Sequence, residues 1–429
     1  MKTLAVILTF AASTTAPLAL SSPAGAVGET CNGQVATLVG SPGSTITGTA
    51  GADVIVTNGA MQVDAGAGDD VICTTGTVGH DTFNPAVAVL AGEGNDLVDR
   101  RGELDPLAVG AADLGAGNNT FYGSAVRDLL NSRAGSSDVL STGDGSDTVF
   151  LSYVTTVSTE VDTVDVGPGD DSVTVNSGFS TGLSLTGGQG TDSLTTNQSP
   201  APGWTLDAAA GRVRAGATVY MSFSDFDIYT AYGDDPVAFI GSDRAERLFQ
   251  AAAGMRSAKM GGGDDDLSVW IAGSKKKLKV EGGDGSDRIT ISGSKKDRFD
   301  LDLSRGRLRS PSGPNGRAGG FEHATVIGGH VVLTGTDGPN QLVWSGCQGG
   351  SVRAGGGADT VTLQVVDPED YTCRSGHQPR LRAFGQGGSD ALVGGPSGDF
   401  LIGGPGVDKA HGGPGQDVCR AEDESSCER

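Results

Sequence analysis

Apolar and polar residues alternate over short stretches, and glycine-rich runs separate these stretches along most of the chain. Leu278-Lys279-Val280 precedes one such run, and Ile289-Thr290-Ile291 follows it. Alternation with a period of two is typical of β-strands that bury one face. Because strands this short cannot bury a core alone, they must stack on their neighbours. The pattern therefore predicts an all-β chain built from repeated strand, turn and strand.

Residues 385–420 carry the most regular form of this pattern, as four consecutive nine-residue units: GQGGSDALV, GGPSGDFLI, GGPGVDKAH and GGPGQDVCR. The glycines allow turns with positive φ, and an aspartate closes each turn. The three residues that remain, with an apolar one in the middle, suffice for a short strand. The aspartates occupy the sixth position of each unit and are Asp390, Asp399, Asp408 and Asp417.

Stacking of these units brings their aspartates together. If two units form one rung and parallel rungs lie about 4.8 Å apart, Asp390 lies over Asp408 and Asp399 over Asp417. Two carboxylates about 5 Å apart repel each other by about 3 kcal/mol at an effective dielectric constant near 20. Backbone carbonyls of the turns face the same space, so a cation is expected there. A flexible set of oxygen ligands without His or Cys suits Ca²⁺ better than zinc or a softer metal.

The four units resemble the RTX, or haemolysin-type, calcium-binding nonapeptide GGxGxDxUx of secreted bacterial proteins. The resemblance implies a right-handed parallel β-roll or β-helix solenoid with calcium-binding turns. It also implies that the aspartates of stacked turns share Ca²⁺ with the turn carbonyls, so that several ions are bound. Two positions depart from the pattern, Gln386 at the second position of the first unit and Ser397 at the fourth position of the second.

Single copies of the same signature occur upstream, beginning at Ala65, Ala91, Thr142, Val166, Gly187, Met260, Gly282 and Ala354. We expect their sixth residues to be metal ligands as well: Asp70, Asp96, Asp147, Asp171, Asp192, Asp265, Asp287 and Asp359. Most of these copies are separated by about 20 residues, as one rung would be. Each rung is therefore predicted to carry one calcium-type turn and other, unmarked corners, and consecutive copies are predicted to stack on one edge.

Degenerate copies fill some of the gaps and have Asp53, Asn119, Asp128, Glu246 and Asn340 at the sixth position. For these a plain turn is at least as good an interpretation as a metal site, because amides carry no charge and several of the glycines are missing.

Three segments are predicted. Residues 1–26 have Lys2, an apolar run and a small-residue ending, as in a secretory signal peptide cleaved before Val27. Residues 27–384 form an irregular solenoid, and residues 385–429 form a tandem β-roll with a disulfide-closed cap. No later segment has the roughly 18 apolar residues of a membrane span. We therefore expect a secreted, extracellular protein without a membrane span.

The irregular solenoid contains a duplication of about 95 residues, 187–281 and 282–376, in which Asp192 corresponds to Asp287. Residues 246–255 resemble a helix in their propensities, but their counterparts 340–349 do not, so both are predicted to be strand and turn. Residues 200–203 and 310–320 are predicted to be loops, the second a protrusion from a rung.

Composition agrees with narrow stacked rungs, since 71 of 429 residues are glycine and only 5% are aromatic. A formal net charge of −22 disfavours nucleic acids and anionic membranes as partners and favours divalent cations. Six cysteines in an exported chain indicate disulfides. Contacts in a solenoid are local in sequence, which favours the pairs Cys31–Cys73, Cys347–Cys373 and Cys419–Cys427.

Catalytic motifs are absent from the sequence. The five histidines form no HExxH pattern, and no GxSxG occurs in a strand-to-helix context. The lysine run at 275–279 is interpreted as a solvated strand edge, and the acidic cluster at 367–370 as an exposed loop. We expect no enzymatic activity. A polysaccharide lyase or epimerase, by analogy of architecture alone, and a surface adhesin remain as alternatives, with extracellular polysaccharide or protein as partners.

Overall fold

The computed structural model describes residues 28–76, 87–102, 109–133, 137–152, 161–176, 181–197, 201–232, 237–250, 255–271, 277–310, 316–364 and 379–428. The predicted signal peptide, the acidic cluster at 367–370, and Lys275 and Lys276 lie outside these residues. The described residues form strands and turns and no helix. Accordingly, no helix in this part of the chain is long and apolar enough to cross a membrane.

Nearly all strands belong to two long sheets that face each other. The first sheet contains β4 (Thr45–Thr47), β6 (Gln62–Asp64), β8 (Val87–Leu90), β10 (Gly110–Asp113), β12 (Asp128–Arg133), β14 (Thr148–Ser152), β16 (Ser172–Val175), β18 (Ser193–Thr196), β22 (Ile228–Ala231), β24 (Arg247–Gln250), β26 (Asp266–Trp270), β28 (Arg288–Ser292), β32 (His323–Gly328), β34 (Gln341–Gly346), β36 (Thr360–Leu363), β38 (Ala391–Val393), β40 (Lys409–His411) and β42 (Asp423–Ser425).

The second sheet contains β3 (Leu38–Val39), β5 (Val54–Val56), β7 (Val71–Cys73), β9 (Leu97–Asp99), β11 (Thr120–Tyr122), β13 (Val139–Ser141), β15 (Thr163–Asp165), β17 (Leu183–Thr186), β19 (Thr205–Asp207), β20 (Arg212–Ala215), β21 (Thr218–Ser224), β23 (Val237–Ile240), β25 (Met255–Gly262), β27 (Lys279–Asp284), β29 (Arg298–Asp302), β30 (Arg307–Arg309), β31 (Gly316–Gly319), β33 (His330–Thr334), β35 (Gly350–Gly356), β37 (Leu381–Gly387), β39 (Phe400–Ile402) and β41 (Val418–Arg420). A small antiparallel pair, β1 (Thr30–Cys31) and β2 (Gln34–Val35), precedes it.

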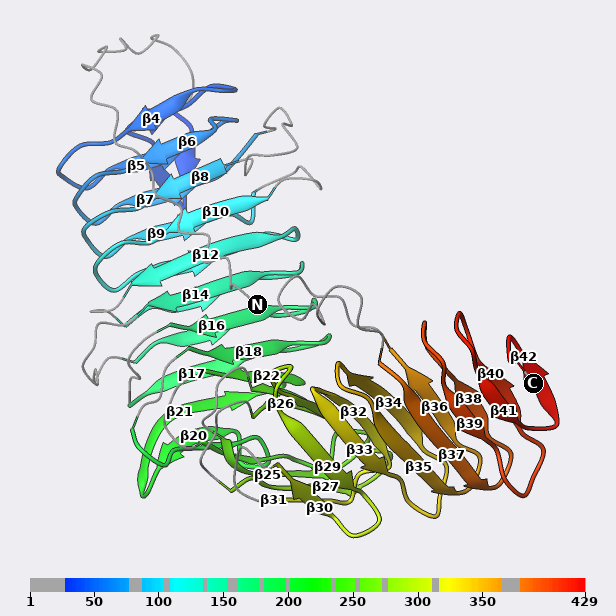
Figure 1. Cartoon of the computed structure of the whole chain (residues 1–429). Helices are drawn as coiled ribbons and strands as arrows, with labels where there is room; N and C mark the ends of the chain where they lie inside the picture. The colour runs from blue at the N-terminus through cyan, green and yellow to red at the C-terminus, as the bar shows by residue number, and fades with distance from the viewer. Residues whose placement is uncertain are drawn as a thin grey trace.

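The chain alternates between the two sheets, and each strand pairs in parallel with its counterpart in the next rung (Figure 1). Leu194 in β18, for example, pairs with Val173 in β16 and with Tyr229 in β22. In most of the short strands an inner residue points inward and is buried, as are Val173, Leu194 and Leu392. These rows of inward residues form one continuous core between the sheets. The predicted all-β parallel solenoid is therefore confirmed.

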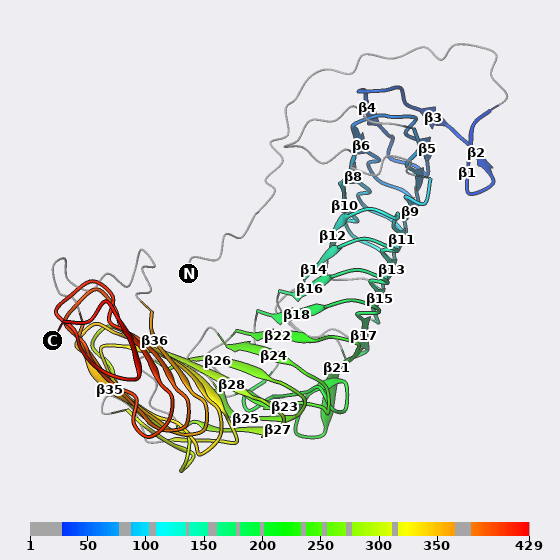
Figure 2. The ribbon, with the colours of Figure 1, turned by 90° about the vertical axis from the view of Figure 1, so that its right-hand side faces the viewer.

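The stack of rungs bends near its middle. Figures 1 and 2 show the strands from β4 to β18 stacked in one direction and those from β32 to β42 at an angle to them. Aromatic side chains fill the core where the direction changes. The ring of Tyr229 lies 5.8 Å from that of Phe223 and 5.4 Å from that of Phe239. Rungs with large aromatic side chains thus lie between the two arms.

Both copies of the duplicated segment contain a three-stranded excursion of the second sheet. In each, two antiparallel pairings join three consecutive strands, β19 to β21 in one copy and β29 to β31 in the other. The prediction that residues 310–320 form a loop is wrong for β31. Its backbone pairs with β27 on one side and β30 on the other, which gives polar residues such as Arg317 a strand conformation.

Residues 246–255 agree with the prediction of strand and turn, since they include β24 and the start of β25, while 251–254 lie outside the described residues. The disulfides Cys31–Cys73 and Cys419–Cys427 are present, as predicted. Cys347 is also disulfide-bonded, and its predicted partner Cys373 lies outside the described residues. The first and last of these bonds tie the two ends of the stack to neighbouring rungs.

Candidate metal centre

The turns of the solenoid form two separate edges. At edge 1 the chain passes from the first sheet to the second, and at edge 2 it returns from the second to the first. Asp70 and Asp96 lie on edge 1, directly before β7 and β9. The marked aspartates from Asp147 to Asp359 precede strands of the first sheet and lie on edge 2. The prediction that consecutive copies stack on one edge is therefore wrong, because the signature changes edges between Asp96 and Asp147.

The four tail units alternate between the edges. Asp390 and Asp408 lie on edge 2, and Asp399 and Asp417 lie on edge 1. The backbone N–H of Asp390 donates a hydrogen bond to Oδ1 of Asp408 at 2.9 Å, and that of Asp399 donates to Oδ1 of Asp417 at 2.7 Å. The predicted stacking of these two pairs is confirmed.

Glycines are required in these turns for two reasons. Gly94 has a φ of 137°, a conformation that side chains disfavour. A β-carbon added to Gly94 would also lie 2.1 Å from the carbonyl oxygen of Gly68 in the preceding rung. The same clash recurs along edge 2, where a β-carbon on Gly190 would lie 1.6 Å from the oxygen of Gly169. The glycines thus permit both the turn and its close stacking.

One carboxylate oxygen of each marked aspartate belongs to a ladder of hydrogen bonds along the edge. Oδ1 of Asp96 accepts the N–H of Asp70 at 2.9 Å, and Oδ1 of Asp171 accepts the N–H of Asp147 at 2.7 Å. Each carboxylate is therefore fixed by the backbone of the rung before it. The ladder holds the side chain inside the turn, away from solvent.

The other carboxylate oxygen is buried and has no hydrogen-bond partner in most of the predicted metal ligands. These are Asp70, Asp96, Asp147, Asp171, Asp192, Asp265, Asp287, Asp359, Asp390, Asp408 and Asp417. This oxygen, Oδ2, points back towards the first residue of its own turn, since a β-carbon on Gly385 would lie 2.2 Å from Oδ2 of Asp390. A buried oxygen that carries negative charge without a partner is unfavourable unless a cation lies beside it.

Asp399 is the exception among the predicted ligands. Its Oδ2 accepts the N–H of Gly395 at 2.6 Å, and its Oδ1 accepts the N–H of Leu381 at 2.7 Å. Its unit is the one in which Ser397 replaces a glycine. Both oxygens of this carboxylate are therefore satisfied by the backbone.

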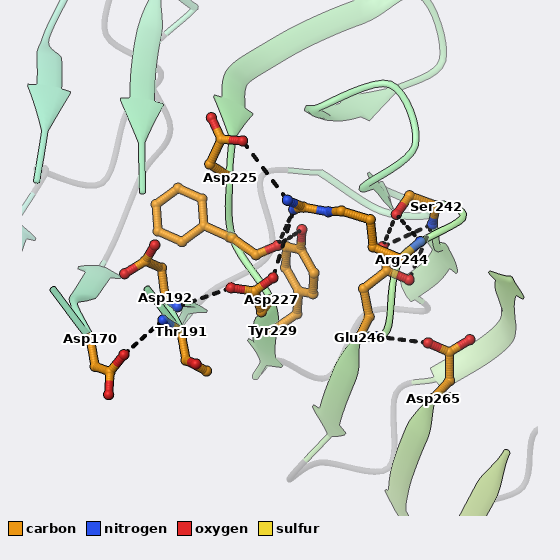
Figure 3. Close-up of polar contacts among 11 residues, drawn as sticks. Asp170, Thr191, Asp192, Asp225, Asp227, Tyr229, Ser242, Arg244, Glu246 and Asp265 are labelled. Carbon is orange, nitrogen blue, oxygen red and sulfur yellow. Dashed lines mark hydrogen bonds and ion pairs between the residues drawn. The ribbon is translucent and has the colours of Figure 1, made fainter. Parts of the chain in front are cut away.

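In the degenerate turns, as at Asp399, protein groups form hydrogen bonds with the side chain at the sixth position. Oδ2 of Asp53 accepts the N–H of Thr49 at 2.7 Å, and Oε1 of Glu246 accepts that of Ser242 at 2.9 Å. Figure 3 shows Glu246 held by Ser242 in this way, next to Asp265. Nδ2 of Asn119 donates to the carbonyl of Gly117 at 3.0 Å, and Nδ2 of Asn340 to that of Glu322 at 2.7 Å. In these turns, protein groups occupy the positions that stay open in the regular ones.

Asp128 has a protein cation as its partner. Its carboxylate pairs with the guanidinium of Arg100, and both side chains are almost completely buried. A second arginine lies at the bend of the solenoid, where Arg244 pairs with Asp225 and Asp227 at 3.9 Å each (Figure 3). Protein cations thus lie beside acidic side chains outside the regular turns.

The pKa values of the aspartates in the regular turns also indicate that positive charge is needed there. Burial raises the pKa of Asp147, Asp171 and Asp265 to about 7 from an ordinary value of 3.8. Burial also raises the pKa of Asp70, Asp287 and Asp359 to about 6. Neighbouring carboxylates of the ladder add to this effect, as Asp147 and Asp192 do for Asp171. The ionised ladder is therefore strained electrostatically unless positive charge is supplied.

The donor set fits calcium. No group of three or more His, Cys, Asp or Glu side chains that could hold a metal ion is found among the described residues, so backbone carbonyls or water are needed as further ligands there. Ca²⁺ accepts six to eight oxygen ligands, including carboxylates, backbone carbonyls and water. The regular turns offer an open carboxylate oxygen and glycine carbonyls, which match these preferences.

Some members of the ladders were missed by sequence analysis because they lack the glycine signature. On edge 1, Asp138 accepts the N–H of Asn119 and Asp162 that of Asp138, each at 2.8 Å. On edge 2, Glu322 and Glu422 accept the N–H groups of Asp287 and Asp408, each at 2.8 Å. An acidic residue directly before a short strand, at rung spacing, is the signal that could have found Asp138 and Asp162.

Residues 384–419 match the family model of the RTX calcium-binding nonapeptide repeat, in four copies. The chain carries RTX calcium-binding repeats. Its fold, a parallel β-solenoid with a β-roll at the C-terminal end, is the one that RTX repeats form. No curated protein sequence matches the chain. The upstream turns lie outside the matched residues but share the geometry of the RTX turns, as the open Oδ2 atoms of Asp147 and Asp171 show.

Proposed function

We propose that the chain is a secreted protein in which several Ca²⁺ ions, held by the turns of both edges, stabilise an elongated solenoid with a structural or interaction role outside the cell. One observation carries the proposal. Regular turns leave a buried carboxylate oxygen open, whereas degenerate turns close the corresponding position with Thr49, Ser242 or a side-chain amide. This contrast is expected if a ligand completes the regular turns only.

The residues that would hold calcium are the eleven aspartates with an open Oδ2, from Asp70 to Asp417, together with carbonyls of their turns. Asp399, whose oxygens are both satisfied, would contribute least. Bound calcium would supply positive charge to each ladder and so offset the repulsion between stacked carboxylates. Since the unfolded chain lacks these sites, its binding free energy would add to the stability of the fold.

Secretion is supported by the disulfides at both ends of the stack, which persist in oxidising compartments. The leader-like residues 1–26 point the same way. We also propose that the chain has no catalytic activity of its own, because the buried acidic residues are engaged in ladders rather than exposed in pairs to a substrate.

Thermal melting with and without calcium tests the proposal. The calcium-loaded protein should melt at least about 15 °C higher than the same protein in chelator, since several ions act together. Magnesium at equal concentration should give a much smaller increase, because it prefers a rigid octahedral shell. A melting temperature and circular dichroism spectrum indifferent to chelator would contradict the proposed function.

A further inference from the structure

The outward face of the second sheet near the C-terminal end carries a cationic and aromatic surface. We call this surface the β35–β41 face. Its outward side chains form two rows across four strands: Arg353, Phe384, Ile402 and Arg420 in one row, and Ser351, Arg382, Phe400 and Val418 in the other. None of these eight residues is acidic, although the whole chain has 52 acidic and 30 basic residues.

The rings and guanidinium groups of this face lie side by side. The guanidinium of Arg353 lies 5.8 Å from the centre of the Phe384 ring, and the rings of Phe384 and Phe400 lie 6.1 Å apart in an edge-on arrangement. Arg382 lies directly beside Phe400 in the strand register. Each of the two aromatic rings therefore lies next to an arginine in a neighbouring strand.

The cations of the face are exposed and available. Arg353, Arg382 and Arg420 are exposed. Ion pairs within the described part of the chain involve none of these three. Elsewhere on the same sheet, Arg305 and Arg307 pair with Asp302. The guanidinium groups of the face thus keep their hydrogen-bond donors for a ligand.

A cavity of about 1140 Å³ opens on this face. It is lined by Arg380, Arg382, Phe384, Phe400 and Val418, with polar groups such as Gln348, Ser397 and Gln416 around them. Among the lining residues that the structure describes, Asp399 is the only carboxylate, and it is buried and satisfied by backbone N–H groups. The described lining therefore presents guanidinium donors and aromatic rings to solvent.

We propose that the β35–β41 face binds an anionic polysaccharide that carries carboxylate groups, such as a polymer of uronic acids. Guanidinium groups bind carboxylates through paired hydrogen bonds, and aromatic rings pack against the apolar faces of sugar rings. The surrounding net charge of −22 repels a ligand as densely charged as a nucleic acid. A sugar polymer with one charge on each ring fits an isolated cationic strip better. Such a polysaccharide would be the partner in the proposed interaction role. This proposal rests on the proposed function only because the face needs the calcium-dependent fold.

Titration with short galacturonate oligomers tests the inference, with the full chain at a fixed calcium concentration and the methyl-esterified oligomers as the uncharged counterpart. The carboxylate form should bind at least about tenfold more tightly than the ester. Arg382→Ala and Arg353→Ala should each weaken binding by about fivefold to tenfold, since each loses charge-assisted hydrogen bonds. Phe400→Ala should weaken binding of both forms. Arg247→Ala, which removes an exposed arginine from the first sheet, should leave affinity unchanged.

Circular dichroism of each variant in calcium separates a failure of this inference from a failure of the fold. The inference is overturned if folded protein does not bind the carboxylate oligomers, if the ester binds equally well, or if the arginine variants bind as the unchanged chain does. Equal affinity for single-stranded DNA would assign the face to polyanions in general and overturn the carbohydrate assignment. Self-association that Phe400→Ala abolishes would assign the face to a second copy of the chain instead.

Discussion

At the scale of single residues, the decisive feature is the second oxygen of the turn aspartates. The sequence predicts which aspartates close glycine turns and that they stack, because glycine and aspartate have strong local preferences. It does not predict which carboxylates stay open. Asp399 has the regular sixth position, yet backbone N–H groups satisfy both of its oxygens. That distinction depends on the conformation of each turn and on the rung beside it, which spacing alone does not reveal.

Asp171→Asn tests the role of an open oxygen. The amide keeps the size of the side chain and removes its charge, so the calcium-loaded protein should lose roughly 1 to 3 kcal/mol of stability. In the calcium-free protein the same substitution should cost less stability or even increase it, because one source of repulsion between the carboxylates of the ladder disappears. Asp53→Asn is the matched control, since Thr49 already satisfies that carboxylate. Melting of both variants with and without calcium measures the difference, and equal calcium dependence in the two would contradict the assignment.

The raised pKa values predict how stability changes with pH. Asp147, Asp171 and Asp265 have folded pKa values of about 7 against an ordinary 3.8, so the folded state holds protons that the unfolded state has released. The stabilisation is complete below pH 3.8 and is lost as pH rises through about 7. Calcium-free protein should therefore melt at a higher temperature near pH 5 than near pH 8. The increase caused by calcium should be larger near pH 8, because protons compete with it for the same oxygens. Melting in calcium-free buffers at both pH values checks the sign, and a calcium-free protein more stable near pH 8 would contradict it.

At the scale of strands and turns, the alternation of apolar and polar residues predicts many of the strands. It does not predict on which edge a turn lies, or strands that lack the alternation. Alternation marks β28 correctly, since Ile289 and Ile291 are buried as expected. The change of edge between Asp96 and Asp147 escapes prediction because a turn signature does not say which sheet it leaves. β31 escapes because Arg317 and its neighbours carry no strand pattern, and only pairing with β27 and β30 makes them a strand.

Gly190→Ala tests whether stacking, and not turn conformation alone, requires glycine. Gly190 has a φ of 134°, and a β-carbon there would lie 1.6 Å from the carbonyl of Gly169, so neighbouring rungs must separate. We expect a loss of about 3 kcal/mol or more. Gly216→Ala is the control, because it has a φ of 58° with nothing within 4 Å of the added carbon, and should lose only about 1 kcal/mol. Chemical unfolding in calcium measures both, and equal losses would show that stacking contributes little.

At the scale of the whole molecule, two arms meet at an aromatic-rich bend, and both ends are closed by disulfides (Figure 1). Edge 2 runs through both arms and carries ladders of hydrogen-bonded acidic side chains, such as the one from Asp128 to Asp171 and the one from Asp359 to Glu422, so charge at one rung is felt at the next. The repeated motif and the terminal disulfide pairs could be predicted from local sequence. The bend could not, because it depends on how rungs with large core residues such as Tyr229 pack on their neighbours, which no local pattern describes.

A crystal structure of the calcium-loaded protein, with ions located by anomalous scattering, would show directly which turns bind calcium. We expect ions beside the open Oδ2 atoms of the regular turns, such as those of Asp147, Asp171 and Asp390. We expect none at the self-satisfied positions of Asp53, Asn119 and Glu246. Ions at the degenerate turns, or regular turns that stay empty at saturating calcium, would contradict the proposed calcium sites.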